Sequence, residues 1–321
     1  MRIDVHGHYF PREYLAVATA AYARPADSVE AGIHRILTTK VGVDPKMYEL
    51  DARLEDMARA GVDLMVLSVS IPQTYHADRA TAVAMAQAAN DGTAEACRRY
   101  PDRFKGYVHL PLPHVDAALD ELARGIDQLG LHGVAIGGNV LQQPLDTPAF
   151  APVFDEIDRR HLALFIHPMT PCGIEAMQEY DLAAAVGYLL DTCLAALRLI
   201  YSGTCDRCPN LQPILCHAGG YLPFQWDRLD TSFRTRPEAR RHIARPPSEY
   251  LRRFYYDNAN YHLPALRCTL ETVGAERMLL GSDYPFAIGD IDRTVRVLDA
   301  LPLTAAQRAL IEYQNAQRLL R

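Results

Sequence analysis

The sequence has no excess of positive charge and very little lysine. Its 33 Lys and Arg residues stand against 39 Asp and Glu residues, which gives a formal net charge of −6 at pH 7 and a pI of about 6.1. Lysine occurs only at Lys40, Lys46 and Lys105, and no polybasic stretch is present. Such a charge balance attracts neither nucleic acid nor an anionic membrane surface, so we expect neither as a partner.

Long apolar runs and patterned cysteines are also missing. No run approaches the ~20 apolar residues of a membrane span, and a strand-like segment follows Met1 directly, without the apolar stretch of a signal peptide. The seven cysteines are scattered. Cys205 and Cys208 have the spacing of half a zinc or redox site, but no second pair lies nearby, and we interpret them as packing residues. These features predict a cytoplasmic protein with reduced thiols.

What the sequence does have is a regular alternation of short apolar runs with amphipathic helical stretches. The 321 residues are 49% apolar and 22% charged, which is ordinary for a globular protein. Eight runs have the length and composition of strands: residues 2–6, 64–69, 104–109, 133–137, 163–167, 212–217, 254–258 and 278–281. Helical stretches lie between or after them, at residues 80–100, 115–129, 152–160, 183–202, 264–273 and 290–300.

Eight strand–helix units predict an α/β fold, a closed (β/α)₈ TIM barrel that forms one domain over residues 1–321. Such a barrel takes about 250 residues, and the surplus falls in two places. Residues 9–50 form an insertion, or lid segment, between the first strand and its helix, and residues 219–250 follow the sixth strand. Because both segments follow the C-terminal end of a strand, we expect both to lie over the catalytic rim.

Side chains that can bind a metal stand at the ends of four of these strands: His6, His8, His167, His217 and Asp283. The two-residue spacing of His6 and His8 points both side chains to one face of the first strand. Taken singly, each signal is weak, because strand-end histidines are often only hydrogen-bonded and Asp283 could be a turn or cap residue. Taken together, they predict one divalent-metal site at the mouth of the barrel. The fourth strand run, Val-Ala-Ile-Gly-Gly, offers no bridging ligand, so we expect a single metal ion.

These motifs, in this order, resemble those of the amidohydrolase superfamily, and more narrowly the branch typified by aminocarboxymuconate-semialdehyde decarboxylase. The resemblance is carried by Ile-Asp-Val-His-Gly-His-Tyr-Phe-Pro, Phe-Ile-His-Pro, His-Ala-Gly-Gly-Tyr-Leu-Pro-Phe and Gly-Ser-Asp-Tyr-Pro-Phe. It runs from the first strand to the last helix and includes Met-Ala-Arg-Ala-Gly-Val-Asp at residues 57–63.

The resemblance implies a set of ligands for one divalent metal, usually zinc, with manganese or iron as alternatives: His6, His8, His167 and Asp283. It also implies that His217 stays off the metal and acts with Asp283 in catalysis as the acid/base. An arginine eleven residues after that histidine, here Arg228, is implied to cross a homodimer interface and hold the carboxylate of a small substrate.

Two features depart from the family pattern. The family's His-Gly-Gly-Gly is His-Ala-Gly-Gly at residues 217–220. The decarboxylase also carries a second carboxylate-binding arginine in the long loop after the first strand, and the matching stretch here, residues 38–44, has none. Lys40 could replace it, but as a point charge and not as a bidentate fork.

The residues and the resemblance lead us to expect a metal-dependent, non-oxidative decarboxylase, a carboxy-lyase that acts on a small aromatic or unsaturated carboxylic acid. Because the loop arginine is missing, an alternative reaction is also compatible with the sequence. In this alternative, the same site hydrolyses a C–C bond or lactone, or hydrates an unsaturated acid. A non-catalytic metal-binding barrel is a third alternative. Five polar strand-end residues argue against it, because the stability of a barrel requires none of them.

Overall fold

The computed structural model describes residues 1–320 and contains a closed barrel of parallel strands. The barrel strands are β1 (Ile3–His8), β2 (Leu64–Ser68), β3 (Phe104–Gly106), β4 (Val108–His109), β5 (Val134–Gly137), β8 (Ala163–His167), β9 (Gln212–Leu215), β10 (Tyr255–Asp257) and β11 (Met278–Leu279). Two parallel sheets, β1-β2-β3 and β4-β5-β8-β9-β10-β11, share them. A short antiparallel hairpin, β6 (Asn139–Val140) and β7 (Gln143–Pro144), lies outside the barrel.

Backbone hydrogen bonds join the two sheets into one barrel. The N–H of Tyr107, between β3 and β4, donates to Leu67 at 3.1 Å, so β3 and β4 act as one interrupted strand. At the other junction the Val5 N–H donates to Leu280 at 2.9 Å, and Gly7 forms a bridge to Tyr284. The eight strand positions are those predicted from the sequence, and the (β/α)₈ barrel is confirmed.

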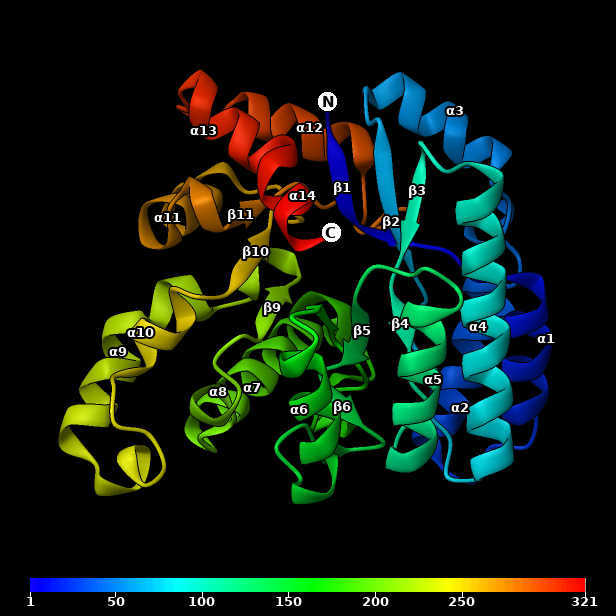
Figure 1. The fold of residues 1–321 in the computed structure, drawn as a ribbon, viewed down its shortest axis with the longest axis horizontal. Helices are drawn as coiled ribbons and strands as arrows, with labels where there is room; N and C mark the ends of the chain where they lie inside the picture. The colour runs from blue at the N-terminus through cyan, green and yellow to red at the C-terminus, as the bar shows by residue number, and fades with distance from the viewer. Residues whose placement is uncertain (321) are drawn as a thin grey trace.

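Helices cover the outside of the barrel (Figure 1). The larger ones are α3 (Asp51–Ala60), α4 (Arg79–Arg99), α5 (Val115–Asp127), α6 (Ala151–Arg159), α7 (Tyr188–Tyr201), α9 (Leu222–Thr235), α11 (Leu263–Val273) and α12 (Ile291–Asp299). Shorter ones are α8 (Thr204–Arg207), α10 (Pro247–Leu251), α13 (Ala305–Ala309) and α14 (Asn315–Leu319). A π-helical turn, η5 (Ala183–Gly187), precedes α7, and the 3₁₀ turn η6 (His217–Gly219) follows β9.

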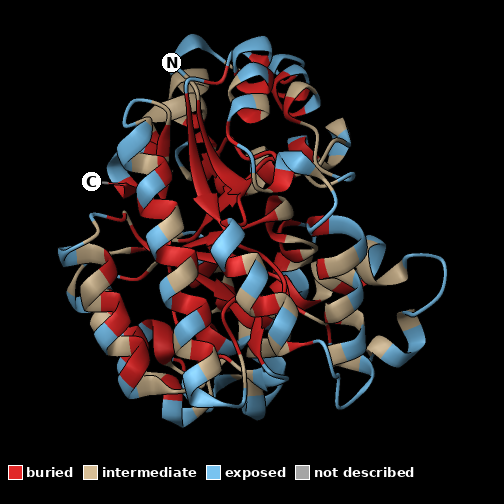
Figure 2. Ribbon diagram, turned by 90° about the vertical axis from the view of Figure 1, so that its right-hand side faces the viewer, coloured by how far each residue is buried: buried red, intermediate tan, exposed pale blue. Residues whose placement is uncertain are grey.

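The strands are buried on both faces, as expected for a parallel sheet under a ring of helices. Inside the barrel, Val5, Val66, Tyr107 and Phe165 belong to one apolar cluster, and the Tyr107 and Phe165 rings stack at 5.2 Å. A second, larger cluster fills the space between strands and helices. Figure 2 shows the buried strands at the centre and the helices exposed on their outer faces. The barrel interior is therefore packed, and only its rims can hold a site.

The insertion at residues 9–50 is largely helical and divides between two places. Its first helix, α1 (Arg12–Ala21), packs along α4 on the outside of the barrel (Figure 1), where Gly92 of α4 leaves room for Pro11. After α2 (Ser28–Ile36), the π-helical turn η1 (Leu37–Val41) and the 3₁₀ turn η2 (Pro45–Met47) reach the rim. The first half also contacts the loop after β2, because the hydroxyls of Tyr14 and Tyr22 on and after α1 donate to the carbonyls of Gln73 and Tyr75.

One segment, Ala183–Tyr201, is 19 residues long and has a mean hydropathy of 1.6, enough by length and composition to cross a membrane. The segment contains Asp191 and Arg198, so it is not a continuous apolar run. In the fold this segment comprises η5 and α7, and 44% of its apolar window is buried inside the protein. A barrel helix that packs against β8 and α10 accounts for this composition.

Candidate active site

The barrel brings His6, His8, His167 and Asp283 together at the C-terminal ends of their strands. One ligand atom from each residue lies within 4.8 Å of all the others. His6 and His8 project from the inner face of β1, and Gly7 between them lies against Met65, whose Sδ would be 2.4 Å from any added Cβ. Asp283 has a φ of 60°, which turns its carboxylate back toward the barrel axis just beyond β11.

The distances within this group are short. The Nε2 atoms of His6 and His8 are 3.1 Å apart. Oδ1 of Asp283 lies 2.9 Å from Nε2 of His8, 3.2 Å from Nε2 of His6 and 3.9 Å from Nε2 of His167. All four side chains are buried, with at most 6% of any residue exposed.

The outer ring nitrogen of each histidine already faces a partner. Nδ1 of His6 lies 2.7 Å from Oδ2 of Asp257, Nδ1 of His167 lies 3.0 Å from the Pro168 carbonyl, and Nδ1 of His8 lies 3.4 Å from the Ser68 hydroxyl. Three Nε2 atoms are therefore directed to one point together with a carboxylate oxygen. This set of donor atoms fits a single divalent cation. The Nδ1 atoms of His6 and His167 face a carboxylate and a backbone carbonyl, as is usual for imidazoles that bind a metal.

The charge distribution also fits a cation. Burial lowers the pKa of His6, but the charges and hydrogen bonds of Asp283 and Asp257 outweigh it and raise that pKa to about 10. Burial lowers the pKa of His8 to about 4 and keeps the pKa of His167 well below its usual value. Of the three closely spaced imidazoles, only His6 therefore favours the protonated, positively charged form. The neighbouring acid, Asp283, has a pKa well below its usual value and stays ionised.

His217 stands beside this group without belonging to it. Its Nε2 is 3.4 Å from Oδ2 of Asp283, and among the described residues its buried Nδ1 has no hydrogen-bond partner. Burial lowers the pKa of His217, but the hydrogen bond and charge of Asp283 raise it above its usual value overall. Both His217 and Ala218 have a φ of 56°, and Gly219 and Gly220 follow in similarly left-handed backbone. This turn places the imidazole at the edge of the metal-binding group.

A cavity of about 620 Å³ opens over His167, His217 and Asp283. Much of its wall is apolar, with Phe286, Ile71 and Leu189 among the lining residues. The insertion contributes a wall that includes Lys40 and Met47, and the turn η5 contributes Ala184 and Ala185. A small aromatic acid fits a pocket of this size and composition.

Two buried acids that support the site were not predicted from the sequence. Asp257 ends β10 and contacts both His6 and the N–H of Ala218. Asp4, two residues before His6, accepts hydrogen bonds from the hydroxyl and the N–H of Ser282, at 2.5 and 3.1 Å. Burial raises the pKa of Asp4 to about 6. Asp257 could have been found from the sequence, because it lies near the end of the seventh strand run, as the predicted ligands lie near the ends of theirs.

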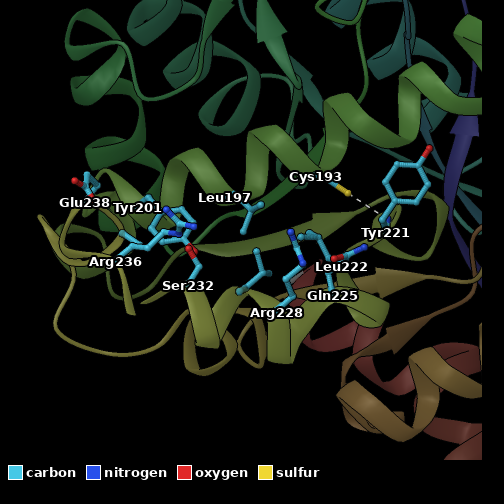
Figure 3. A pocket seen from close by; sticks show the side chains of 12 residues that line it. Cys193, Leu197, Tyr201, Tyr221, Leu222, Gln225, Arg228, Ser232, Arg236 and Glu238 are labelled. Atoms are coloured by element: carbon cyan, nitrogen blue, oxygen red, sulfur yellow. Dashed lines mark hydrogen bonds between the residues drawn. The ribbon is translucent and has the colours of Figure 1, made fainter. Parts of the chain in front are cut away.

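Arg228 does not face this cavity. It lies on α9 in a separate groove of about 580 Å³ between α7 and α9, together with Tyr201, Arg236 and Glu238 (Figure 3). The two cavities share no lining residue. A role for Arg228 at the metal site of its own subunit has no support from this placement.

Comparison with known proteins is consistent with this geometry. A family model described as amidohydrolase matches residues 3–321. The chain belongs to the amidohydrolase family. This amidohydrolase is 35% identical over 303 residues to the 2-amino-3-carboxymuconate-6-semialdehyde decarboxylase of Dictyostelium discoideum, over 91% of this chain and 83% of the relative.

Two solved structures resemble this amidohydrolase over its whole length. The 5-carboxyvanillate decarboxylase of Sphingomonas paucimobilis superposes with a TM-score of 0.92 at 28% identity, covering 100% of this chain and 98% of the other. The 5-carboxyvanillate decarboxylase of Novosphingobium aromaticivorans, in complex with manganese and 4-hydroxy-3-methoxy-5-nitrobenzoic acid, superposes with a TM-score of 0.85 at 27% identity, covering 100% and 96%.

Proposed function

We propose that this amidohydrolase is a metal-dependent, non-oxidative decarboxylase of a small aromatic or unsaturated carboxylic acid. The observation that carries the proposal is the buried group of three imidazoles and one carboxylate, with His217 beside it, at the base of a largely apolar cavity. The relatives and structural neighbours named above are decarboxylases of carboxylic acids, which supports the same reaction here.

His6, His8, His167 and Asp283 would hold the cation, which when bound supplies Lewis acidity toward a substrate oxygen. His217 lines the cavity and would carry the proton that replaces CO₂ on the substrate carbon. Asp283 orients this imidazole through Oδ2. The apolar wall excludes water, which strengthens the electrostatic interactions during loss of CO₂.

For the metal we propose Zn²⁺, because imidazole nitrogens and a carboxylate oxygen are ligands that zinc commonly takes. Mn²⁺ and Fe²⁺ remain alternatives, and the Novosphingobium decarboxylase was crystallised with manganese. Activity after removal of metal and reconstitution with each ion in turn would rank the three.

We propose that residues 9–50 serve as a lid segment through their second half, and that Lys40 stands in for the loop arginine. Lys40 lies on η1 and is the one lysine among the lining residues of the metal cavity. As a mobile point charge it would attract a second anionic substituent without fixing it in the bidentate manner of arginine. This favours substrates with a single carboxylate over the dicarboxylate of the related semialdehyde decarboxylase.

We propose a cytoplasmic homodimer in which Arg228 reaches the partner's cavity to hold the substrate carboxylate. Phe224, on the same helix, is 82% exposed, as an interface residue would be in an isolated subunit. The seven cysteines form no disulfide, which agrees with a reducing compartment.

The direct test is product analysis with enzyme reconstituted with Zn²⁺ or Mn²⁺ and a panel of hydroxybenzoates and muconate-like acids. We expect release of CO₂ and a product whose mass is lower than that of the substrate by the mass of CO₂. Metal-free enzyme and the variant His167→Ala serve as controls and should be inactive. A product that has gained water would replace this proposal with the hydrolase or hydratase alternative, and no turnover of any substrate would remove its support.

A further inference from the structure

Helix α3 carries a guanidinium that is fully buried next to the metal-binding group. The side chain of Arg53 is 0% exposed, and among the described residues it forms no ion pair with a carboxylate. Its Nη2 instead donates to the carbonyl of His8 at 2.5 Å and to the carbonyl of Lys46 at 2.9 Å. Its Cζ lies 4.9 Å from the centre of the Tyr284 ring.

Burial of this cation is costly, because a guanidinium loses its hydration on leaving water. Packing alone would be served by an apolar side chain of similar volume. The contacts that compensate the burial are therefore informative. Besides a bond from Nη1 to the sulfur of Met65 on β2, at 3.2 Å, they include three on segments that adjoin the site. His8 is one of the four proposed ligands, Tyr284 follows the ligand Asp283 directly, and Lys46 belongs to the cavity-facing half of the insertion.

A second side chain of α3 holds the same segments from one turn further along. Oδ2 of Asp56 accepts hydrogen bonds from the Tyr284 hydroxyl at 2.7 Å and from Nζ of Lys46 at 2.7 Å. Arg59 contacts the other carboxylate oxygen. Arg53 and Asp56 thus both contact Lys46 and Tyr284, while Arg53 also bonds to the carbonyl of His8 at the end of β1.

We infer that Arg53 is a positioning residue that couples metal affinity to the placement of the insertion, by fixing the backbone of His8, the backbone of Lys46 and the ring of Tyr284 at once. This inference rests on the proposed metal role of the His/Asp group. Arg53 itself is expected to contact neither substrate nor cation. It acts by holding the backbone of the ligand His8 and the backbone of Lys46, which belongs to the cavity-facing half of the insertion.

The test is the variant Arg53→Lys, which keeps a buried cation but is shorter and lacks the planar guanidinium that lies over the Tyr284 ring while its Nη2 reaches both carbonyls. We expect the dissociation constant for Mn²⁺, measured by titration of metal-depleted protein, to rise about tenfold or more, as for other residues that support metal ligands. Hydrogen exchange at residues 44–47 and 281–284 should become faster. The matched control is Arg103→Lys, because Arg103 also binds two carbonyls, of Asp63 and Val62, near the starts of β2 and β3.

A loss of metal affinity in Arg53→Lys but not in Arg103→Lys, at similar thermal midpoints, supports the inference. Metal affinity within twofold of the wild type in folded Arg53→Lys overturns it. Should Arg53→Lys not fold, Arg53→Met decides instead, because an apolar side chain of similar volume keeps the packing and removes the bonds to both carbonyls. Weaker Mn²⁺ binding by folded Arg53→Met then supports the inference, and unchanged binding overturns it. Failure of the wild type itself to bind Mn²⁺ would instead refute the proposed function.

Discussion

Among the four histidines at the site, His217 differs by having a ring nitrogen with no partner among the described residues. The outer nitrogens of His6, His8 and His167 face Asp257, Ser68 and Pro168, which fixes their orientation toward one centre. Among the described side chains, His217 is hydrogen-bonded through Asp283, at 3.4 Å. Because it lines the cavity and lies outside the group of four candidate ligands, we expect it to exchange a proton with a bound substrate.

The variant His217→Asn tests this division of roles. Asparagine can still contact Asp283 but cannot carry the transferred proton, so we expect turnover to fall by about 10²-fold or more. The metal content should stay at the wild-type level, because the four proposed ligands are untouched. Elemental analysis of the purified variant beside a decarboxylation assay checks both parts. Loss of metal comparable to that of His167→Ala would show that His217 is itself a ligand.

At the residue scale, the four candidate ligands lie together because each follows an apolar run, and a barrel brings the ends of its strands to a common rim. Their role as metal ligands stays a prediction. Asp257 was missed although it ends a strand run in the same way, because an acid that supports a histidine looks in sequence like any polar strand end. Asp4 was missed for a different reason. Its partner Ser282 is 278 residues away in sequence, and only closure of the barrel brings the two together.

At the scale of elements, the strands were predicted almost to the residue, whereas the path of the insertion was not. Eight buried parallel strands have a strong apolar signature, but nothing in residues 9–50 indicates that α1 turns outward to pack along α4. The π-helical turns η1 and η5 were also not predicted. Each adds a wide turn where a helix meets the cavity, and such turns are common at functional sites.

Helix α7 is tied to the loop after β8 by a buried acid, and this contact predicts a pH effect on stability. Asp191 is 4% exposed and accepts hydrogen bonds from the Met169 N–H at 2.7 Å and from Nδ2 of Asn139 at 2.9 Å. Burial raises its pKa to about 6 in the folded protein, against 3.8 for the unfolded chain. Between these values the folded state binds more protons than the unfolded state, so the contribution of Asp191 to stability decreases as pH rises from about 4 to about 6.

We therefore expect the stability advantage of the wild type over Asp191→Asn to be larger at pH 5 than at pH 7. Asparagine does not titrate, and its amide can still accept the Met169 N–H but places a donor against Asn139. Urea unfolding of both proteins at the two pH values measures the difference in unfolding free energy. An advantage that grows from pH 5 to pH 7 would mean that the acid is ionised in the folded protein and its pKa is not raised.

For the whole molecule, the open question is whether one chain contains a complete active site. The metal-binding group and His217 lie in one cavity, but Arg228 lies in a groove between α7 and α9 that shares no lining residue with it (Figure 3). If Arg228 serves the partner, each active site of the proposed homodimer takes its metal ligands from one subunit and its carboxylate-binding arginine from the other. Two subunits with different defects would then form a dimer with one intact site.

Mixing the variants Arg228→Ala and His167→Ala tests this arrangement. Each variant alone should be nearly inactive, the first without its substrate arginine and the second without metal. After unfolding and refolding together in equal amounts, half of the dimers should be mixed, and each mixed dimer should contain one active site of two. Activity should then recover to about one quarter of the wild-type value. An arginine that acts within its own subunit would give no recovery, because every site in the mixed dimer would then lack either the arginine or the metal. Sedimentation analysis of the same samples would confirm that dimers had formed.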